Sequence, residues 1–362
     1  MKILGIDTSC DETAAAVVAD GRDVLSNVVA SQIEVHQEYG GVVPELASRK
    51  HIEAINYIVS RSLAEADVTF KDLEAIAVTN RPGLIGALLV GVAAAKSLAY
   101  CHNLPLLGIN HIEGHIYAPF LAQLASQNLL SKSMVHDALT FPHICLTVSG
   151  GHTLLVEVHE GWQYKVLGGT QDDAAGEVYD KVAKYLGLGF PGGKVIDDLA
   201  QKGDPAAIKF PRPMRNTDDY QFSFSGIKTS VRYFVEKARR AGLLVENGRA
   251  DVTPMNRDMI TIEDIAASFQ AAVVDVLVYK SIRAAKATGA KAITLTGGVA
   301  ANSQLRASLK VAATEIGAEV YYPPMRLCTD NGAMIAGIAY QKYQQGLRDE
   351  LSLNATPNGS LV

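Results

Sequence analysis

A strand, a turn of small polar residues and a second strand follow one another at two places in this chain. The first copy, "KILGIDTSCDETAAAVVAD", begins at residue 2, and the second, "HICLTVSGGHTLLVEVHEG", begins at residue 143. Self-similarity of this kind indicates an internal duplication. We therefore expect two related halves, each of which opens on a strand–turn–strand unit.

Helical and strand-like segments alternate after each copy, which favours a layered α/β architecture. In the first half we expect helices at 47–66 and 83–100 and strands at 73–80 and 104–110. In the second half we expect helices at 174–188, 262–289, 299–317 and 331–346, a strand at 291–298, and loops at 189–200 and 210–230.

A polar segment without a periodic pattern begins near residue 121 and separates the two halves. The sequence predicts an N-terminal lobe of residues 1–125 and a C-terminal lobe of residues 126–330. The last helix is expected to return and pack on the first lobe, so residues 331–362 complete the N-terminal lobe.

Composition narrows the class of protein. Hydrophobic residues make up 48% of the 362 residues, enough for a large core, and a net charge of −5 excludes a basic coat over the whole surface. Four separated cysteines without a C-x-x-C pair fit a reducing cytosol. We see no signal peptide, and we interpret segment 83–100, interrupted by Lys96, as a buried helix. The sequence thus predicts a cytoplasmic protein without membrane contact.

Three turns of small residues follow apolar strands: Asp7-Thr8-Ser9, Ser149-Gly150-Gly151 and Gly297-Gly298. Backbone N–H groups in such turns can face phosphate oxygens, because glycine permits a close approach. Gly297-Gly298 also precedes a predicted helix, whose N-terminus favours an anion. Each turn alone is explained as a simple chain reversal. Together they predict a nucleotide site, because ligands gather at strand ends in α/β folds.

The stretch "NHIEGH" places His111 and His115 four residues apart, on one face of a helix. Two imidazoles and a carboxylate form the triad typical of iron(II), which also suits zinc. The candidate third ligand is Asp330 in "CTDNGA", with a helix cap as the alternative interpretation. Metalloproteases place a glutamate directly after the first histidine. Glu113 lies one residue further on, so the spacing argues against that chemistry and leaves Glu113 without a role.

Basic residues gather between residues 202 and 240. Nine lysines and arginines lie there against four acids, with aromatic residues interleaved, among them Phe210, Tyr220, Phe222 and Phe224. The local excess of positive charge is typical of a surface that binds a phosphate backbone. A solvated helix face explains the same composition equally well.

Nine motifs, taken together and in order, resemble the tRNA threonylcarbamoyltransferases of the TsaD type, also called the glycoprotease-like family. They are "GIDTSCDET", "YGGVVPELASRKH", "RPGLIGALLVG", "NHIEGH", "VSGGHT", "DDAAGEVYDK", "FSFSGIKT", "TGGVAAN" and "CTDNGAMIA". The resemblance implies an actin-like, sugar-kinase-like α/β fold of two duplicated lobes with a nucleotide cleft between them. It also implies transfer of a threonylcarbamoyl group from threonylcarbamoyl-AMP to the N6 amine of the adenosine immediately 3′ of the anticodon. The tRNAs concerned read codons that begin with A, and AMP is released.

The resemblance also implies a set of site residues. The metal ligands would be His111, His115 and Asp330, with iron(II) as the expected metal and zinc as the alternative. The contacts of the adenine nucleotide (threonylcarbamoyl-AMP, AMP, ATP or ADP) would be Thr147, Val148, Ser149, Gly150, Gly151, Asp180, Gly193, Asp197 and Asn302, with Asp7, Ser9, Gly297 and Gly298 as further candidates. No residue is assigned as a catalytic acid or base.

The implied partners are tRNA, a TsaB-type paralogue subunit and a TsaE-type small ATPase. A separate synthase would supply the threonylcarbamoyl-AMP, and the chain alone would form a homodimer. Two features depart from the family: Asp7 stands where many members have glutamate, and the segment 121–140 is longer than expected.

The expected mechanism is direct attack by the tRNA amine, because the acyl adenylate is already activated and the motifs contain no serine–histidine or cysteine–histidine dyad. A metal would orient the carbonyl group and offset developing negative charge. Two other functions remain open. One is a metal-dependent glycoprotein endopeptidase, and the other is a non-enzymatic, chaperone-like nucleotide-binding module.

Overall fold

The computed structural model describes residues 1–123, 139–245 and 259–361, and the chain divides into two compact units. Unit 1 comprises Met1–Thr140, His159–Tyr164 and Tyr321–Val362, and unit 2 comprises Phe141–Val158 and Lys165–Val320. Residues 321–330 therefore belong to unit 1. The sequence analysis assigned them to the C-terminal lobe, which it ended at residue 330. Most of the long segment expected at 121–140 lies outside the described residues.

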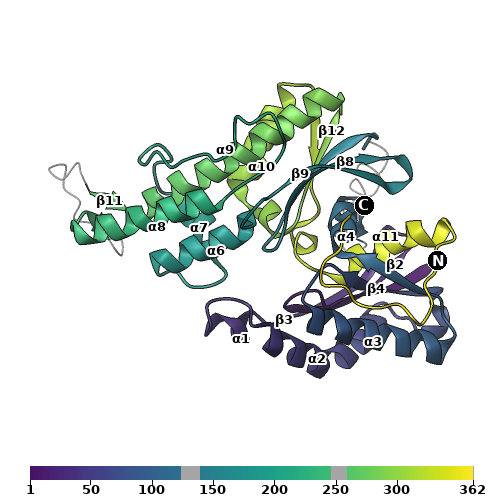
Figure 1. Cartoon of the computed structure of the whole chain (residues 1–362). Coiled ribbons are helices and arrows are strands. Elements are labelled where there is room, and N and C mark those ends of the chain that lie inside the picture. The colour runs from purple at the N-terminus through teal and green to yellow at the C-terminus, as the bar shows by residue number, and fades with distance from the viewer. Residues whose placement is uncertain (124–138, 246–258, 362) are drawn as a thin grey trace. The chain divides into compact units, whose positions relative to one another are not determined.

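Unit 1 is built on a six-stranded sheet in the order β5-β4-β1-β2-β3-β6. Figure 1 labels its strands β2, β3 and β4. Its elements in chain order are β1 (Lys2–Asp7), β2 (Glu12–Ala19), β3 (Asp23–Ser31), α1 (Ile33–Gln37), α2 (Pro44–Glu65), the short 3-10 helix η1 (Phe70–Asp72), β4 (Ala75–Arg81), α3 (Ile85–His102), β5 (Leu106–Asn110), α4 (His111–Tyr117), η2 (Ala118–Phe120), β6 (Ala122–Gln123), η3 (Glu160–Trp162), η5 (Met325–Leu327) and α11 (Gly332–Gln344).

Unit 2 contains a five-stranded sheet in the order β13-β12-β7-β8-β9 and a separate pair, β10-β11. Its elements are β7 (His143–Val148), β8 (Thr153–His159), β9 (Gln163–Gly169), α6 (Ala175–Leu186), α7 (Gly192–Ala200), α8 (Ser225–Arg240), β10 (Leu244–Val245), β11 (Ile260–Thr261), α9 (Ile262–Thr288), β12 (Ala292–Thr296), η4 (Gly298–Ala301), α10 (Ser303–Thr314) and β13 (Glu319–Tyr321).

The two large sheets share one pairing plan. In unit 1, β1 pairs in parallel with β4 and antiparallel with β2. In unit 2, β7 pairs in parallel with β12 and antiparallel with β8. The strand–turn–strand units found in the sequence are therefore β1-β2 and β7-β8, and the structure supports the predicted duplication.

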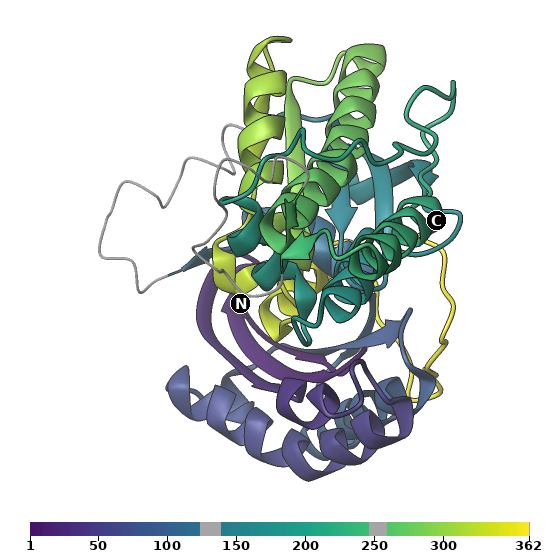
Figure 2. The ribbon, with the colours of Figure 1, turned by 90° about the vertical axis from the view of Figure 1, so that its left-hand side faces the viewer.

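Helices cover both faces of the unit 1 sheet. Alternate residues of β1 point to opposite faces, and Leu4 and Ile6 share one buried cluster with residues of α2 and α3, which lie side by side along that face (Figure 2). On the other face, a β-carbon on Gly5 would collide with Gly332 and Ala336 of α11. The last helix therefore packs on the first sheet, as the sequence predicted.

Several elements differ from the sequence-based expectation. The predicted loop at 210–230 ends in helix α8, which begins at Ser225. Helix α3 buries only one side, since Ile85 and Leu89 are 45% and 47% exposed, whereas the sequence predicted a buried helix. The predicted loop at 189–200 contains helix α7, because Gly192 lets it pack tightly on Ala183 and Tyr179 of α6. The helix predicted to begin at residue 299 begins at Ser303, after η4, where Asn302 supplies its N-cap.

By length and composition, α3 and α9 would each be able to cross a membrane. In this structure, each helix packs within its own unit. Helix α9 is mostly buried in unit 2, and α3 packs its buried side against the unit 1 sheet.

Candidate functional site

The three predicted metal ligands converge in unit 1. Nε2 of His111 lies 3.4 Å and Nε2 of His115 lies 3.1 Å from the same carboxylate oxygen of Asp330. The two imidazole rings meet edge to face, with centroids 4.6 Å apart. One ligand atom from each residue lies within 4.8 Å of the other two. Two imidazole nitrogens and one carboxylate oxygen around a common point fit iron(II) or zinc(II).

Local sequence explains how the ligands are presented. Helix α4 starts directly after β5, and the Asn110 side chain caps it by accepting a hydrogen bond of 2.8 Å from the backbone N–H of Ile112. Asp330 immediately precedes the cap of α11. That cap is Asn331, whose side chain accepts a hydrogen bond from the backbone N–H of Met334. Because Asn331 performs the capping, the carboxylate of Asp330 is left to face the two histidines.

Asp7 and Ser9 support the first histidine. Asp7 Oδ2 lies 3.2 Å from Nδ1 of His111, and Ser9 Oγ lies 3.1 Å from the same nitrogen. Hydrogen-bonding partners on the second ring nitrogen fix the orientation of a metal-binding histidine. The sequence suggested these two residues as part of a phosphate-binding turn. In the structure both contact the histidine.

The surroundings of this cluster are strongly acidic. Burial alone lowers the pKa of His111, but the carboxylates of Asp330 and Asp7 raise it well above its ordinary value. Burial, together with the nearby carboxylates of Asp330 and Asp11, raises the pKa of Glu12 to about 10. A buried cluster of carboxyl groups favours a bound cation. Glu12 was not singled out in the sequence, because its proximity to Asp330 arises only in the fold.

Glu113 has a partner away from the metal ligands. Its carboxylate accepts a hydrogen bond of 2.6 Å from Nζ of Lys342 on α11. The ion pair is largely buried and joins α4 to α11. Glu113 is therefore engaged in holding two helices together, which argues against its use as the general base of a peptidase.

Two of the three predicted turns lie next to each other in unit 2. The turn Ser149-Gly150-Gly151 connects β7 to β8, and its two glycines are exposed with open space where a β-carbon would be. Gly297, at φ +87°, follows β12, and a β-carbon there would collide with the carbonyl group of Val148. The hydroxyl of Thr296 also donates to that of Thr147 across 3.1 Å. The paired strands thus bring both glycine turns to one edge of the sheet.

The remaining predicted contacts form a hydrogen-bond network among four helices of unit 2. Asp180 of α6 accepts from the backbone N–H of Gly192, at the start of α7, across 2.7 Å. Asp197 of α7 accepts from Gln270 of α9 across 2.8 Å. Gln270 in turn accepts from the side chain of Asn302, the N-cap of α10, across 2.7 Å. Gly193, next to Gly192, has open space around its α-carbon.

Gln270 was missed by the sequence analysis. It is a buried amide on a helix whose neighbouring residues are mostly apolar, in "IAASFQAAVV". A buried polar side chain needs hydrogen-bonding partners. A glutamine inside an apolar helical segment was therefore the sequence feature that could have indicated this network.

Comparison with known proteins identifies the family. A family model described as TsaD, tRNA N6-adenosine threonylcarbamoyltransferase, matches residues 23–337. A protein of that name from Clostridioides difficile is 48% identical over 98% of this chain and 97% of its own length. One from Thermotoga neapolitana is 46% identical over the whole of both chains. The chain belongs to the TsaD family. A further relative of the same name, from Bacillus cereus, is 50% identical over 98% of this chain and 95% of its own.

Solved structures support the fold. Component A of the (R)-2-hydroxyglutaryl-CoA dehydratase of Acidaminococcus fermentans has a TM-score of 0.52 at 14% identity and covers 95% of this chain and 99% of its own. Full-length HypF, in its phosphate- and nucleotide-bound form, has a TM-score of 0.56 at 16% identity, over 95% of this chain and 46% of its own. At such identities the likeness concerns the fold alone. This TsaD family member therefore has the predicted actin-like ATPase fold.

Proposed function

We propose that this TsaD family member transfers the threonylcarbamoyl group from threonylcarbamoyl-AMP to the N6 amine of the adenosine immediately 3′ of the anticodon. The observation that carries the proposal is the near full-length identity of 46% to 50% with relatives named tRNA N6-adenosine threonylcarbamoyltransferase. The converging cluster of His111, His115 and Asp330 gives it chemical support.

These three residues would hold one divalent metal, iron(II) or zinc(II). When bound, the metal would supply Lewis-acid polarisation of an acyl oxygen. The protein's own part is to orient the ligands. Asp7 and Ser9 fix the ring of His111, and the ion pair from Glu113 to Lys342 holds the ligand-bearing helix in place.

The glycine turns of unit 2 would bind the phosphate of threonylcarbamoyl-AMP. The exposed Gly150 and Gly151 leave their backbone N–H groups accessible to an anion, and the turn at Gly297 lies beside them. Four residues would contact the rest of the nucleotide: Asp180 of α6, Gly193 and Asp197 of α7, and Asn302, the N-cap of α10.

The reaction needs no covalent enzyme intermediate. The adenosine amine forms a bond to the carbamoyl carbon, and the bond from that carbon to a phosphate oxygen of AMP breaks. The amine gives up a proton, and the departing AMP phosphate or water accepts it. Holding both substrates in register supplies much of the rate. Because the target adenosine lies in a loop, it can be turned outward without opening a duplex.

The proposal includes partners and location. The tRNAs would be those that read codons beginning with A. A TsaB-type subunit and a TsaE-type ATPase would assist, a separate synthase would supply the adenylate, and the chain alone would form a homodimer. Cytoplasmic location remains a prediction.

The test combines the purified protein, its partner subunits, threonylcarbamoyl-AMP and unmodified tRNA, followed by mass analysis of the tRNA nucleosides. The transferase predicts threonylcarbamoyladenosine and AMP in equal amounts. Chelator-sensitive cleavage of a glycoprotein without modified tRNA would favour the endopeptidase instead. Binding of ATP with neither product would favour the nucleotide-binding module.

A further inference from the structure

Helix α8 begins beside the candidate phosphate-binding turn of unit 2. Asp172 accepts hydrogen bonds from the backbone N–H groups of Phe224 and Ser225 at its start, across 2.8 and 3.2 Å. Asp172 lies just before α6, and the N–H of Gly176 in the first turn of α6 donates to the carbonyl of Ser149. The turn, the start of α6 and the start of α8 therefore form one connected region.

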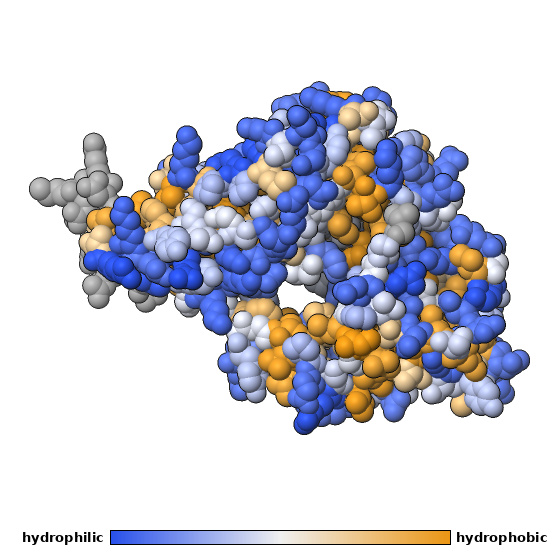
Figure 3. All heavy atoms as spheres, viewed as in Figure 1, coloured by the Kyte–Doolittle hydropathy of each residue, from blue (hydrophilic) through white to orange (hydrophobic). Residues whose placement is uncertain are grey.

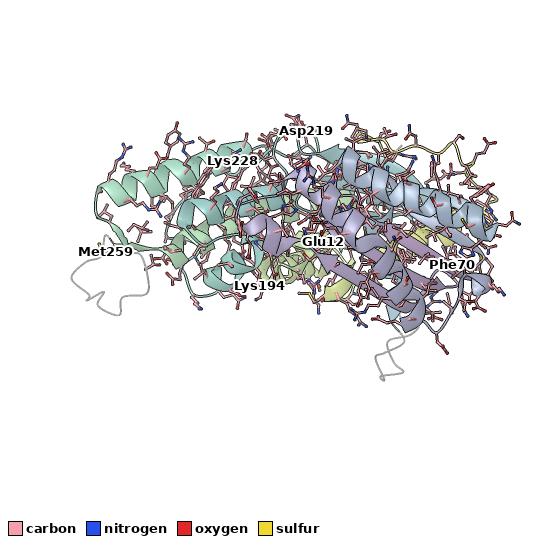
Figure 4. The ribbon with its side chains drawn as sticks, turned by 90° about the horizontal axis from the view of Figure 1, so that it is seen from below. Glu12, Phe70, Lys194, Asp219, Lys228 and Met259 are labelled. Atoms are coloured by element: carbon pink, nitrogen blue, oxygen red, sulfur yellow. The ribbon has the colours of Figure 1, made fainter. Side chains whose placement is uncertain are left out.

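Most cations near the start of α8 are engaged within the protein. Lys228, in the first turns of the helix, pairs with Asp173, and it is labelled in Figure 4. In the preceding loop, Arg212 and Arg215 both pair with Asp275 of α9, across 2.8 and 3.1 Å. These three of the nine cations at 202–240 are thus paired with acids inside unit 2.

The C-terminal half of α8 carries exposed basic residues on the side opposite to its buried side. Val231, Val235 and Ala238 are buried. The opposite side presents what we call the α8 basic face: Arg232, Tyr233, Lys237 and Arg240, all exposed. Residues 233, 237 and 240 lie three or four positions apart and so share one surface of the helix. Figure 3 shows mainly hydrophilic surface over this helix.

Charge and shape at this face suit a polyanion. Arg232 pairs with Glu236 at 3.0 Å, while Lys237 and Arg240 form no ion pair with any residue that the structure describes. Tyr233 is 61% exposed and lies under the guanidinium of Arg232, 5.7 Å from it. Tyr233, Lys237 and Arg240 also line an open hollow of about 700 Å³, together with Glu236 and Ala241.

An RNA backbone fits these features. Lysine and arginine neutralise phosphates, and an exposed aromatic ring can pack on ribose or an unpaired base. The chain as a whole carries a net charge of −5, so a local positive face is unlike the protein's average surface. Helix α8 has 16 residues, and at 1.5 Å per residue it spans about 24 Å. The basic residues in its last turns therefore lie up to about this distance from the helix start, which is beside the candidate nucleotide turn.

We propose that the α8 basic face binds the sugar–phosphate backbone of the tRNA stem adjoining the modified loop. This inference rests on the proposed function, because it assumes tRNA as the substrate.

The test uses the full-length double variant Lys237→Ala/Arg240→Ala. The matched control is Lys291→Ala/Lys310→Ala, which removes two exposed cations elsewhere in unit 2. The affinity for an unmodified tRNA transcript is measured between 50 and 200 mM salt, together with the KM for tRNA and for threonylcarbamoyl-AMP with the partner subunits present. A charge-preserving variant, Lys237→Arg/Arg240→Lys, separates loss of charge from loss of folding.

We expect the test variant to bind tRNA about tenfold more weakly at ~150 mM salt, with a slope of log K against log salt reduced by about two. Its KM for tRNA should rise while the KM for the adenylate stays unchanged, and the control and charge-preserving variants should behave like wild type. Equal tRNA affinity in the test and control variants would overturn the inference. The same holds if the test variant keeps its tRNA affinity but binds a partner subunit more weakly. Failure of the proposed function has a different signature, since wild type itself would then yield no modified nucleoside.

Discussion

The clearest lesson at the scale of single residues concerns Asp7. Its carboxylate, at the end of β1, lies 3.2 Å from Nδ1 of His111, the first residue of α4. The carboxylate is fully buried, and it contacts the ring nitrogen of His111 that faces away from Asp330.

We predict that Asp7→Asn weakens metal binding by about 10- to 100-fold, because the neutral amide no longer stabilises a hydrogen-bonded imidazole ring. Competition with a chromogenic chelator measures this affinity in the purified protein. The matched control is Asp67→Asn, an exposed aspartate of the same unit. Unchanged metal affinity in Asp7→Asn would show that Asp7 has no part in holding His111.

His143 gives a prediction about stability and pH. It is fully buried on β7, and burial lowers its pKa to about 3 from an ordinary value near 6.5. Below about pH 6.5 the unfolded chain binds a proton here that the folded chain does not, so stability falls as the pH falls towards 3. One such group costs about 2 kcal/mol between pH 7 and pH 5.

Replacement by leucine, His143→Leu, should remove this share of the pH dependence. The free energy of unfolding in urea is measured for both proteins at pH 7 and at pH 5. From pH 7 to pH 5 it should fall by about 2 kcal/mol more in the wild type than in the variant. An equal loss in both proteins would mean that His143 takes up a proton in the folded state.

At the scale of elements, α4, which carries His111 and His115, is joined to α11. Asp330 directly precedes the start of α11, and the ion pair between Glu113 and Lys342 joins the two helices further along. The sequence analysis assigned no role to Glu113, and this ion pair supplies one. It was not foreseen because Lys342 is more than two hundred residues away in the chain.

We predict that Glu113→Gln and Lys342→Met each destabilise unit 1 by about 1–3 kcal/mol, since each leaves a partly buried charge without its partner. The double variant should lose less than the sum of the two, because the second change removes a charge that is already unpaired. Unfolding free energies of the four proteins measure the coupling. Strictly additive losses would show that the pair does not join the helices.

Elements whose apolar residues recur at a regular spacing were predictable from the sequence. Elements whose conformation or burial depends on packing against other elements were not. The repeated strand–turn–strand unit and the long helices α2 and α9 follow directly from apolar spacing. Helix α7 was missed because "PGGK" is typical of a loop, and only the fit of Gly192 against α6 favours the helix. Helix α3 was expected to be buried because it is mostly apolar, although only one of its sides faces the sheet.

At the scale of the whole molecule, the sequence indicated the cluster of His111, His115 and Asp330 but not the side chains that contact it. His111 and His115 lie one helical turn apart, so their convergence follows from local spacing. The resemblance to the TsaD family then implied Asp330 as the third ligand. The roles of Asp7, Ser9 and Gln270 depend on segments that meet only after folding, so no local pattern indicates them.

The relatives covering nearly the full chain and the geometry of the metal cluster lead to one account, in which a TsaD-type transferase acts with a metal held by His111, His115 and Asp330. The amount of threonylcarbamoyladenosine formed in tRNA, measured for wild type and for His111→Ala with the same partner subunits, tests this account most directly. We predict abundant modified nucleoside with wild type and a loss of at least about 100-fold with His111→Ala, since removing a metal ligand removes several kcal/mol of transition-state stabilisation. Undiminished modification by His111→Ala would contradict the role of the metal, and absence of modification with wild type under every combination of partners would contradict the transferase itself.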